Sequence, residues 1–371
     1  EDRRPPSEPL DREFDRPRHG RTNPTITPVK LVIQIPCLNE EESLPQVLSE
    51  LPRQVAGFDQ VEWLVVDDGS TDRTVVVARR HGVDHLVRLT SNRGLATAFQ
   101  AGLDAALKLG ADVIVNTDAD GQYSASDIPR LVEPIVERRA DMVVGDRQIQ
   151  TVEHFSPTKK LLQRLGSWVV RRASGTAVLD TTSGFRAYNR EAALQLIVVS
   201  RYTYTLESLI QAGKMSVAIE DVPISPNPTA RESRLLGSTS SYVRRNAFAI
   251  FRAYTLYEPL RVFMLLAILF GVLALAAWSP FLFDWIVNGD RSGHIQSLIL
   301  GAVLMLAAVQ MFALGIIGDA LAGQRAIQQR VYERVRRLEL EAGVEPSNYE
   351  RGDRDHAPPL TVETIETSVA Q

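Results

Sequence analysis

At residues 113–122 the chain reads VIVNTDADGQ, an apolar run that gives way abruptly to acidic and turn-forming residues. A short run rich in Val and Ile that ends in this way predicts a buried strand. In open sheets of parallel strands, ligands bind outside the carboxyl ends of the strands. Asp118 and Asp120 therefore occupy the position where such a sheet would bind its ligand. Two carboxylates this close together are costly unless a cation or a ligand lies between them.

Further apolar runs lie on both sides of this segment. Residues 29–35, 63–66 and 142–144 end in polar residues in the same way, and residues 85–89 form a weaker candidate strand. The best helical pattern spans residues 94–109, with apolar side chains on one side and Gly110 as its C-terminal stop. Strands and helices that alternate at this spacing predict an α/β domain, in which helices cover both faces of a mostly parallel sheet.

Length and composition narrow the class of protein. The chain has 371 residues, enough for one large domain or two ordinary ones. Its 41 basic and 45 acidic residues give a net charge of −4, so the charge balance gives no case for nucleic-acid binding. Cys37 is the only cysteine, which excludes a disulfide framework and argues against a zinc site made of thiolates.

Two late segments have the composition of membrane spans. Residues 262–283 and 295–318 contain no charged side chain over 22 and 24 residues, and a helix needs roughly 20 residues to cross a bilayer. The alternative, two buried helices of a soluble domain, is less favoured because such helices rarely lack a polar face. Arginines flank the pair on its outer sides: Arg244, Arg245, Arg252, Arg261, Arg325, Arg330, Arg334, Arg336 and Arg337. The positive-inside rule then predicts a multi-pass protein of the plasma membrane, with the α/β domain and both termini in the cytoplasm.

The predicted organisation has five parts: a disordered tail at 1–28, the catalytic domain at 29–240, a juxtamembrane helix at 241–259, the hairpin at 260–320, and a basic helix with an acidic tail at 321–371. The first tail is rich in proline and charge and lacks the apolar core of a signal peptide. From about residue 339 the chain is again acidic and polar, so it too is expected to be loose. The juxtamembrane helix mixes aromatic residues with arginines, which favours a place in the headgroup layer over a plain connecting helix.

Two further acidic segments follow the first two strands. PCLNEE at 36–41 places Asn39 where it can cap a helix that begins at Glu40. DDGSTD at 67–72 offers an aspartate to a base or a ribose, and Gly69 permits a tight turn. Each segment alone is also explained by ordinary capping or turn formation.

The acidic pair at 118–120 favours a hard divalent cation, Mg²⁺ or Mn²⁺, because its ligands are oxygens. Such an ion would bridge a diphosphate and neutralise the charge that develops on it as a leaving group. A solvated acidic turn is the alternative, but three acidic strand ends in one domain make the metal site more specific.

Six segments occur in a fixed order: PCLNEE, DDGSTD, SNRGLATAFQAGL, DADGQ, GDR and TTSGFRAY. Together they resemble the inverting GT-A glycosyltransferases related to dolichol-phosphate mannose synthase, over about residues 29–235. The hairpin resembles that of the bacterial and archaeal polyprenyl-phosphate glycosyltransferases. The resemblance implies a GT-A fold, a nucleotide sugar as donor and polyprenyl phosphate as acceptor.

The resemblance also implies roles for individual residues. The residues implied for nucleotide binding are Pro36, Glu40, Asp67, Asp68 and Asp118. Those implied for metal binding are Asp120 and Gln122. The implied catalytic residues are Asp118, Asp120, Arg147 and Glu207. Arg147 matches an arginine that faces the acceptor and donor phosphates, although Asp146 stands where the family has serine. Glu207 matches an acidic position near the sugar, with a carboxylate on a helix surface as the alternative.

Cations for the acceptor phosphate are expected in three further places. Arg186 either holds a phosphate or pins its loop to the domain. Arg231 and Arg234 are candidate phosphate clamps, because guanidinium groups bind phosphate oxygens in a fork. Residues 159–172 form a basic amphipathic pattern that suits the bilayer surface, and Lys160 and Arg164 are the best matches to residues that contact the acceptor. A basic helix packed on the domain is the alternative.

These features predict one displacement with inversion, which moves a hexose from a nucleoside diphosphate sugar to polyprenyl phosphate. The acceptor is already an anion at neutral pH, so no strong general base is required. The resemblance to bacterial glucosyl-type enzymes favours a UDP-sugar over GDP-mannose. A processive polysaccharide synthase is disfavoured because its Q-x-x-R-W motif is absent, and an inactive sugar-nucleotide-binding adaptor because the acidic motifs are intact. Small residues such as Gly301, Ala307 and Ala308 are compatible with a homo-oligomer, a dimer or a tetramer.

Overall fold

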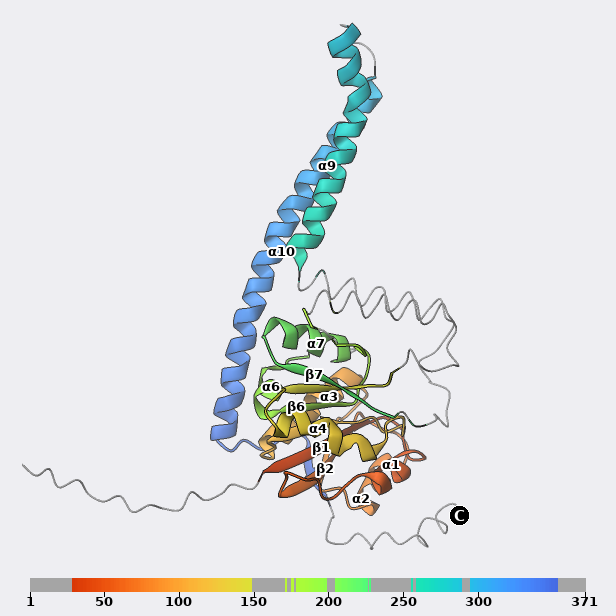
Figure 1. The fold of residues 1–371 in the computed structure, drawn as a ribbon, viewed down its shortest axis with the longest axis vertical. Helices are drawn as coiled ribbons and strands as arrows, with labels where there is room; N and C mark the ends of the chain where they lie inside the picture. The colour runs from red at the N-terminus through yellow and green to blue at the C-terminus, as the bar shows by residue number, and fades with distance from the viewer. Residues whose placement is uncertain are drawn as a thin grey trace, which may run out of the picture.

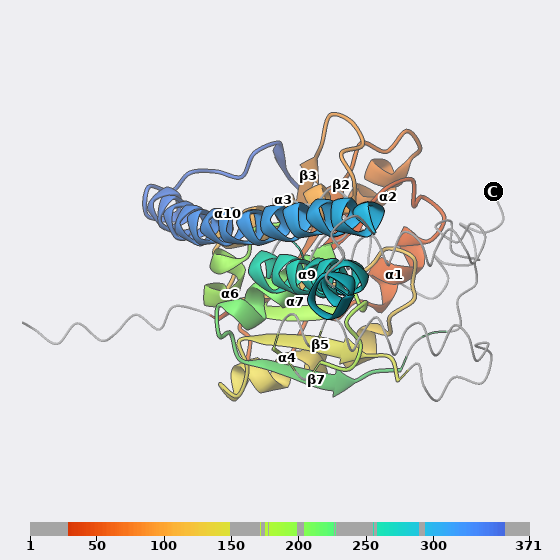
Figure 2. The same cartoon turned by 90° about the horizontal axis from the view of Figure 1, so that it is seen from above.

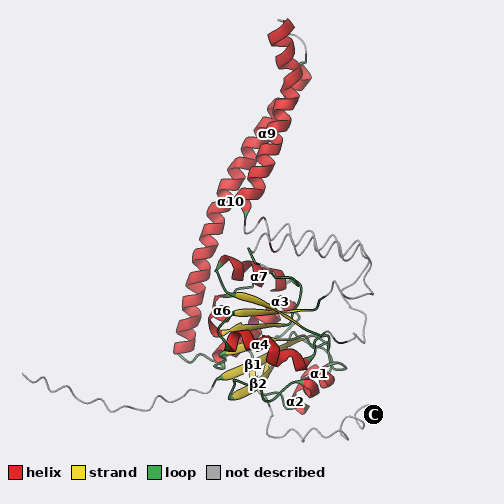
Figure 3. Cartoon of the chain, viewed as in Figure 1, coloured by secondary structure: helices red, strands yellow, loops and turns green. Residues whose placement is uncertain are grey.

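The computed structural model describes residues 29–148, 178–198, 204–225, 258–288 and 294–352, with residues 171, 175, 176, 227 and 255 in addition. The described chain forms one α/β domain and a long helical hairpin (Figures 1 and 3). The tail predicted at 1–28 lies outside the described residues. The same holds for most of the juxtamembrane helix predicted at 241–259.

A single sheet of eight strands forms the centre of the domain, in the order β7-β5-β6-β4-β1-β2-β3-β8. Five strands match the apolar runs of the sequence: β1 (Lys30–Cys37), β2 (Gln60–Asp67), β3 (His85–Arg88), β4 (Val113–Asn116) and β5 (Met142–Asp146). β1 pairs in parallel with β2 and β4, and β2 pairs in parallel with β3. The predicted strands and the mostly parallel sheet are therefore confirmed.

Two strands on the far side of β4 from β1 contain no apolar run from which a strand could be predicted. β6 (Arg186–Asn189) lies between β4 and β5 and is antiparallel to both, while β7 (Ile219–Pro223) is parallel to β5. β6 reads RAYN and β7 reads IEDVP, so their pairing partners rather than their composition make them strands.

Helices cover both faces of the sheet, as predicted. One face carries α1 (Leu44–Glu50), α2 (Thr74–Arg80), the short 3₁₀ turn Ala125–Asp127 and α4 (Ile128–Val136); the other carries α3 (Leu95–Lys108), α6 (Arg190–Gln195) and α7 (Tyr204–Lys214). Each face has its own apolar core, which includes Ile33 and Leu131 on the first and Phe99 and Leu209 on the second. α3 begins and ends within one residue of the predicted span of 94–109.

The hairpin consists of α9 (Pro259–Phe283), a π-helical turn at Asp284–Asn288 and α10 (Ile295–Glu341). The two helices pack against each other, and the indole N–H of Trp278 donates to the carbonyl of Leu298 at 3.1 Å. Most side chains of their apolar stretches are exposed, unlike those of a core helix in a soluble domain. Both helices are long and apolar enough to cross a membrane and are candidate membrane spans.

The predicted loose tail after residue 339 is wrong for the part that the structure describes. α10 continues to Glu341, and β8 (Tyr349–Arg351) then joins the sheet antiparallel to β3. The N–H of Arg88 donates to the carbonyl of Asn348 at 3.0 Å, and the N–H of Gly352 to that of Asp84 at 2.8 Å. The composition was misleading because an edge strand obtains its stability from backbone pairing and not from an apolar run. Figure 2 shows α10 beside α3 and α6 and away from α4.

Candidate active site

The topology brings the functional loops to one edge of the sheet. β1, β2, β4 and β5 point the same way, so the loops that follow them open at the same edge. β6 runs in the opposite direction, with Arg186 opposite Asn116, so the segment 181–185 that precedes it arrives at this edge too. The acidic segments, Arg147 and the TTSGF segment therefore meet, as the strand-end argument predicts.

Asn39 connects the first two loops and does not cap a helix. It has a φ of 56°, and its side-chain carbonyl accepts the N–H of Thr71 at 2.8 Å. α1 begins only at Leu44, with Ser43 at the N-cap. The predicted cap at Asn39 is wrong because asparagine tolerates the left-handed backbone that turns its side chain towards the neighbouring loop. Glu40 stays in this loop, where its N–H donates to the hydroxyl of Thr74 at 2.9 Å.

Asp67 and Asp68 are buried and shape the second loop. Asp67 accepts the N–H of Ser70 at 3.0 Å, and Asp68 accepts the N–H groups of Arg93 and Gly94 at 2.8 and 2.9 Å. These bonds join the end of β2 to the start of α3. The roles of the two aspartates in nucleotide binding stay predictions, as do those of Pro36, which lies in β1, and Glu40.

The turn predicted at Gly69 is confirmed. Gly69 has a φ of 77°, and a Cβ at this position would lie 2.5 Å from the carbonyl carbon of Ser91. Both the backbone conformation and the close approach require glycine.

Asp118 and Asp120 follow β4 on the same turn. Burial, and then the nearby charge of Asp120, raise the pKa of Asp118 to about 7. Asp120 is exposed, and one of its oxygens accepts the N–H of Gln122 at 3.0 Å. Two carboxylates and an amide oxygen on one turn are ligands that Mg²⁺ and Mn²⁺ prefer, and a cation would favour the charged form that burial and the charge of Asp120 disfavour at Asp118. The residues present therefore fit a divalent ion.

Protein ligands alone would leave such an ion incompletely coordinated. Within the part of the chain that the structure describes, no three His, Cys, Asp or Glu side chains gather closely enough to hold a metal. An ion at this turn would complete its coordination with Gln122, phosphate oxygens and water.

Gly184 lets several polar groups approach Asp118 closely. A Cβ at this position would lie 2.6 Å from the hydroxyl of Tyr204 and 3.0 Å from a carboxylate oxygen of Asp118. The N–H of Gly184 donates to the hydroxyl of Tyr123 at 2.9 Å, and the ring of Tyr123 stacks on Phe185 at 5.1 Å between centroids. The glycine of the TTSGFRAY segment is thus required by the space beside Asp118.

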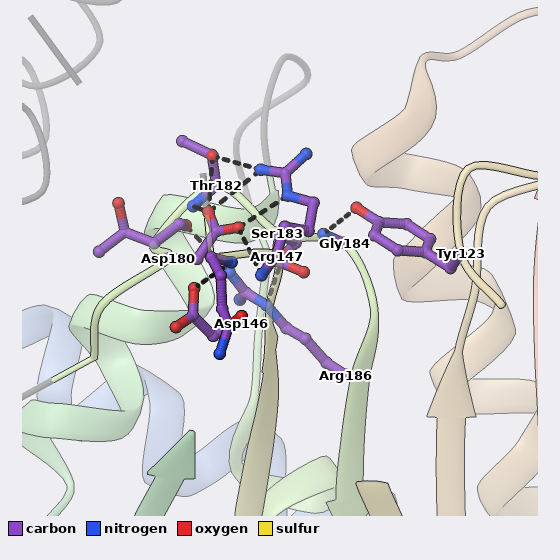
Figure 4. Close-up of polar contacts among 10 residues, drawn as sticks. Tyr123, Asp146, Arg147, Asp180, Thr182, Ser183, Gly184 and Arg186 are labelled. Atoms are coloured by element: carbon purple, nitrogen blue, oxygen red, sulfur yellow. Dashed lines mark hydrogen bonds and ion pairs between the residues drawn. The ribbon is translucent and has the colours of Figure 1, made fainter. Parts of the chain in front are cut away.

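Arg147 follows β5 and is held in a fork by Asp180 (Figure 4). Its Nε lies 2.7 Å from one carboxylate oxygen of Asp180, and its Nη2 lies 3.1 Å from the other and 2.8 Å from the hydroxyl of Thr182. The side chain of Asp180 is 3% exposed and that of Arg147 is 15% exposed. Among the residues that the structure describes, none accepts a hydrogen bond from Nη1, so the fork leaves this group as a donor.

Sequence reasoning missed Asp180. The available signal was its position directly before the TTSGFRAY segment. Burial would raise the pKa of Asp180, but hydrogen bonds from Arg147 and Thr182 lower it below the ordinary value, so the carboxylate stays charged beside the guanidinium. At Asp221 the balance is the opposite: burial, and then the charges of Asp146 and Asp180, raise its pKa to about 6 although the N–H of Leu179 and the charge of Arg186 act to lower it.

Arg186 is enclosed by the protein on all sides. Its side chain has no exposed surface, and its guanidinium donates to the carbonyls of Ser183, Thr205 and Thr181 at 2.8, 2.8 and 3.1 Å and to the hydroxyl of Ser208 at 2.7 Å. A side chain enclosed in this way cannot contact an acceptor phosphate. The structure contradicts that role and supports the alternative, in which Arg186 pins its loop to α7.

The other predicted residues have mixed outcomes. Glu207 is buried on α7, so the alternative of a surface carboxylate is wrong, while its role near the sugar stays a prediction. Lys160, Arg164, Arg231 and Arg234 lie outside the described residues. Cys37 is a free, buried thiol.

The sheet, its acidic loops and the directed arginine define an α/β enzyme of the GT-A type. The sequence profile of Glycosyl transferase family 2 matches residues 32–197. The chain is 32% identical over 207 residues to the undecaprenyl-phosphate mannosyltransferase of Micrococcus luteus, across 53% of this chain and 83% of that relative. It is 26% identical over 316 residues to the dodecaprenyl-phosphate galacturonate synthase of Rhizobium johnstonii, across 81% of this chain and 90% of that relative.

A crystal structure of glucosyl-3-phosphoglycerate synthase from Mycobacterium tuberculosis aligns with 61% of this chain and 80% of its own chain, with a TM-score of 0.49 and 23% identity. On the strength of its sequence relatives, the chain belongs to glycosyl transferase family 2. The names of the two relatives share a polyprenyl phosphate and differ in the sugar, which is mannose in one and galacturonate in the other.

Proposed function

We propose that this chain transfers a hexose from a nucleoside diphosphate sugar, with a UDP-sugar favoured, to polyprenyl phosphate with inversion of the anomeric carbon. The observation that carries the proposal is the meeting of the acidic turn at 118–122 and the fork-held Arg147 at one edge of the sheet. The same chain carries an apolar hairpin. The names of its relatives support a polyprenyl phosphate as the acceptor.

The proposed reaction is a single displacement. An oxygen of the acceptor phosphate forms a bond to the anomeric carbon while the bond from that carbon to the donor diphosphate breaks, and the electron pair leaves with the nucleoside diphosphate. The acceptor is already an anion at neutral pH, so no side chain has to remove its proton first. Nη1 of Arg147 orients the attacking phosphate, and the fork from Asp180 keeps that donor fixed.

A divalent cation held by Asp120 and Gln122, with Asp118 beside it, would stabilise the negative charge of the departing diphosphate. Tyr123 and Tyr204 contact Gly184, which lies beside Asp118.

The hairpin would hold the domain at the membrane surface, where the phosphate of the acceptor lies. We place the domain and both ends of the hairpin in the cytoplasm, because Arg261 and the arginines of the second half of α10 flank the apolar stretches on that side. Labelling of a cysteine placed at Asn288 by a membrane-impermeant reagent would test this orientation. Labelling only from the cytoplasmic side would overturn it.

The decisive experiment uses the full chain in lipid nanodiscs with a polyprenyl phosphate and labelled UDP-sugars or GDP-mannose, offered one at a time. We expect one donor to give a labelled lipid whose anomeric configuration, read by NMR, is opposite to that of the donor. Asp120→Ala should lower turnover by about 10²-fold or more, and a chelator should act like the mutation.

Glu50→Gln, which alters an exposed carboxylate on α1, is the matched control and should leave turnover unchanged. Full turnover by Asp120→Ala would contradict the metal assignment. If the unmodified chain transferred sugar from none of the donors, the proposal would fail and the alternative of an inactive adaptor would stand.

A further inference from the structure

The second half of α10 carries the chain from the apolar hairpin back to the catalytic domain. The uncharged stretch ends at Gly318, and the helix continues without a break to Glu341, a distance of about 35 Å at 1.5 Å per residue. Figure 1 shows that these last turns run along the domain beside α6. The domain is thus attached far from the apolar part of the helix.

Arg336 makes the most buried contact of this attachment. Its side chain is 3% exposed, and its Nη1 donates to the carbonyls of Ala193, Leu194 and Leu196 at 3.0, 3.1 and 3.3 Å, where α6 ends. Its Nε lies 3.6 Å from a carboxylate oxygen of Asp104 on α3. Nε and Nη2 are buried without a hydrogen-bond partner among the described residues, so Nη1 and the charge of Asp104 carry the contact. The three carbonyls at the end of α6 still specify where the guanidinium, and with it α10, sits on the domain.

Three neighbours of Arg336 extend the contact. Glu339 lies 3.0 Å from Nζ of Lys108, the last residue of α3, and Arg337 forms an ion pair with Glu191 of α6. Leu340 packs against the apolar core under α3, α6 and α7. The end of α10 is therefore fixed by buried, charged and apolar contacts together.

The chain then binds the domain a second time through β8. Gly352 lies so close to β3 that a Cβ there would be 1.7 Å from the carbonyl oxygen of Val83. Tyr349 places its hydroxyl 2.9 Å from Nδ1 of His85. We call residues 336–340 and 349–352 the C-terminal clamp. Because β8 lies at the edge of the central sheet, the clamp ties α10 to the sheet itself and not only to a surface helix.

The other helix of the hairpin is tied to the domain as well. Glu258, directly before α9, forms ion pairs with Lys214 at the end of α7 and with Arg261. Both helices of the hairpin thus contact the domain, α9 through the residue before its first turn and α10 through its last residues. Two separate attachments fix an orientation, which a single tether would leave free.

We infer that the C-terminal clamp fixes the height and orientation of the catalytic domain below the bilayer for a membrane-embedded lipid phosphate, with Arg336 as a positioning residue. This inference rests on the proposed function. The phosphate of an embedded lipid lies at a fixed depth and cannot follow a domain that rotates. A misplacement of about 1 Å can cost up to about 100-fold in rate, so a fixed domain has a large advantage for such an acceptor. A water-soluble acceptor diffuses to the site and does not need the clamp.

The test compares two acceptors on the full chain in nanodiscs: a long-chain polyprenyl phosphate embedded in the bilayer and a short-chain, water-soluble isoprenyl phosphate. Arg336→Met keeps the length of the side chain and removes its donors. We expect its rate with the embedded acceptor to fall at least about tenfold, and its rate with the soluble acceptor and its KM for the donor to stay within about twofold. Arg336→Lys should restore part of the loss.

Gly352→Val releases β8 without touching Arg336, so it should show the same difference between acceptors. Arg334→Met changes an exposed arginine of the same helix and is the matched control, with no change expected. Amide exchange at the N–H of Arg88, which bonds to Asn348, reports whether β8 is released, and thermal unfolding reports whether the domain is intact.

An equal loss with both acceptors, or no loss with either one, overturns the inference. If the unmodified chain used neither acceptor, the proposed function itself would be contradicted. That outcome differs from a failure of the inference, because it is seen in the unmodified chain before any variant is made.

Discussion

The end of β5 and the start of β6 each bring an arginine to the same edge of the sheet, yet the two side chains have opposite surroundings. Arg147 is held by the carboxylate of Asp180, and its Nη1 has no hydrogen-bond partner in the part of the chain that the structure describes. Arg186 is enclosed by three carbonyls and a hydroxyl and has no exposed surface. A carboxylate that accepts two hydrogen bonds from a guanidinium orients it and leaves its other N–H groups free, whereas several surrounding carbonyls occupy its N–H groups. The motif gives the position of each arginine, but only its partners show what it does.

The largest effect expected from this difference is at Arg147. Arg147→Met should lower turnover by about 10²-fold or more, because it removes a donor aimed at charge that moves during the reaction. Thermal unfolding should shift to lower temperature as well, because the nearly buried carboxylate of Asp180 loses its cation, so turnover is normalised to folded protein. Arg80→Met, which alters an exposed arginine at the end of α2, is the control and should keep full turnover. Unchanged transfer by Arg147→Met would remove this residue from the mechanism.

A smaller loss, between about tenfold and about 100-fold in kcat, is expected for Asp180→Asn. The amide keeps the shape of the side chain but holds the guanidinium with one acceptor and no charge. The KM for the acceptor should stay the same or fall, because the charge of Arg147 is no longer neutralised. Initial rates at varied acceptor concentrations separate the two constants.

Thr182→Val is the matched control for this variant, because it removes the hydroxyl that contacts Arg147 at 2.8 Å and Asp180 at 2.9 Å but keeps the ion pair between them. Its effect on kcat should be about threefold or less. A raised KM for the acceptor with an unchanged kcat in Asp180→Asn would show that Asp180 does not position Arg147.

For Arg186 the expected effect is on stability. Arg186→Met leaves three buried carbonyls without their donor, at a cost of roughly 3 kcal/mol or more in the free energy of unfolding. The fraction that remains folded should transfer sugar at nearly the original rate, with an unchanged KM for the acceptor. Thermal unfolding in detergent and kinetics normalised to folded protein measure the two quantities. Unchanged stability together with a raised acceptor KM would restore the phosphate role that the structure contradicts.

The sequence alone was sufficient to predict those strands and helices whose residue composition matches the conformation they adopt. The run at 113–115 is apolar, is followed by polar and acidic residues and forms β4 together with Asn116, and the helical pattern at 94–109 forms α3. It was insufficient for β6 and β8, whose residues are mixed or polar and whose strand conformation depends on pairing with distant chain.

The same limit applies to the site. The loops were predictable because strand ends of a parallel sheet share an edge. The partner of Arg147 was not, because Asp180 lies 33 residues away and meets it only through the register of β5 and β6. Local patterns locate a functional side chain, and tertiary pairing decides which of its atoms are free to act.

The smallest expected effect is a change of metal affinity with pH that depends on Asp118. Its direction follows from the pKa of Asp118, which is raised to about 7. Below that pH the carboxyl group is protonated in the metal-free protein, so a divalent cation has to displace a proton in order to bind. The apparent affinity for Mn²⁺ should therefore rise about tenfold per pH unit up to about pH 7 and level off above it. Titration of Mn²⁺ binding by electron paramagnetic resonance between pH 5.5 and 8.5 measures this slope without any turnover.

Asp118→Asn supplies the control for the pH experiment, because an amide has no proton to displace. Its affinity for Mn²⁺ should be weaker at pH 8 and nearly independent of pH across the range. If the unmodified protein also showed no slope, Asp118 would be ionised in the metal-free state, and its burial beside Asp120 would not set its charge. A slope retained by Asp118→Asn would instead assign the proton to another group of the acidic edge. Asp120, which is exposed, is then the next residue to substitute.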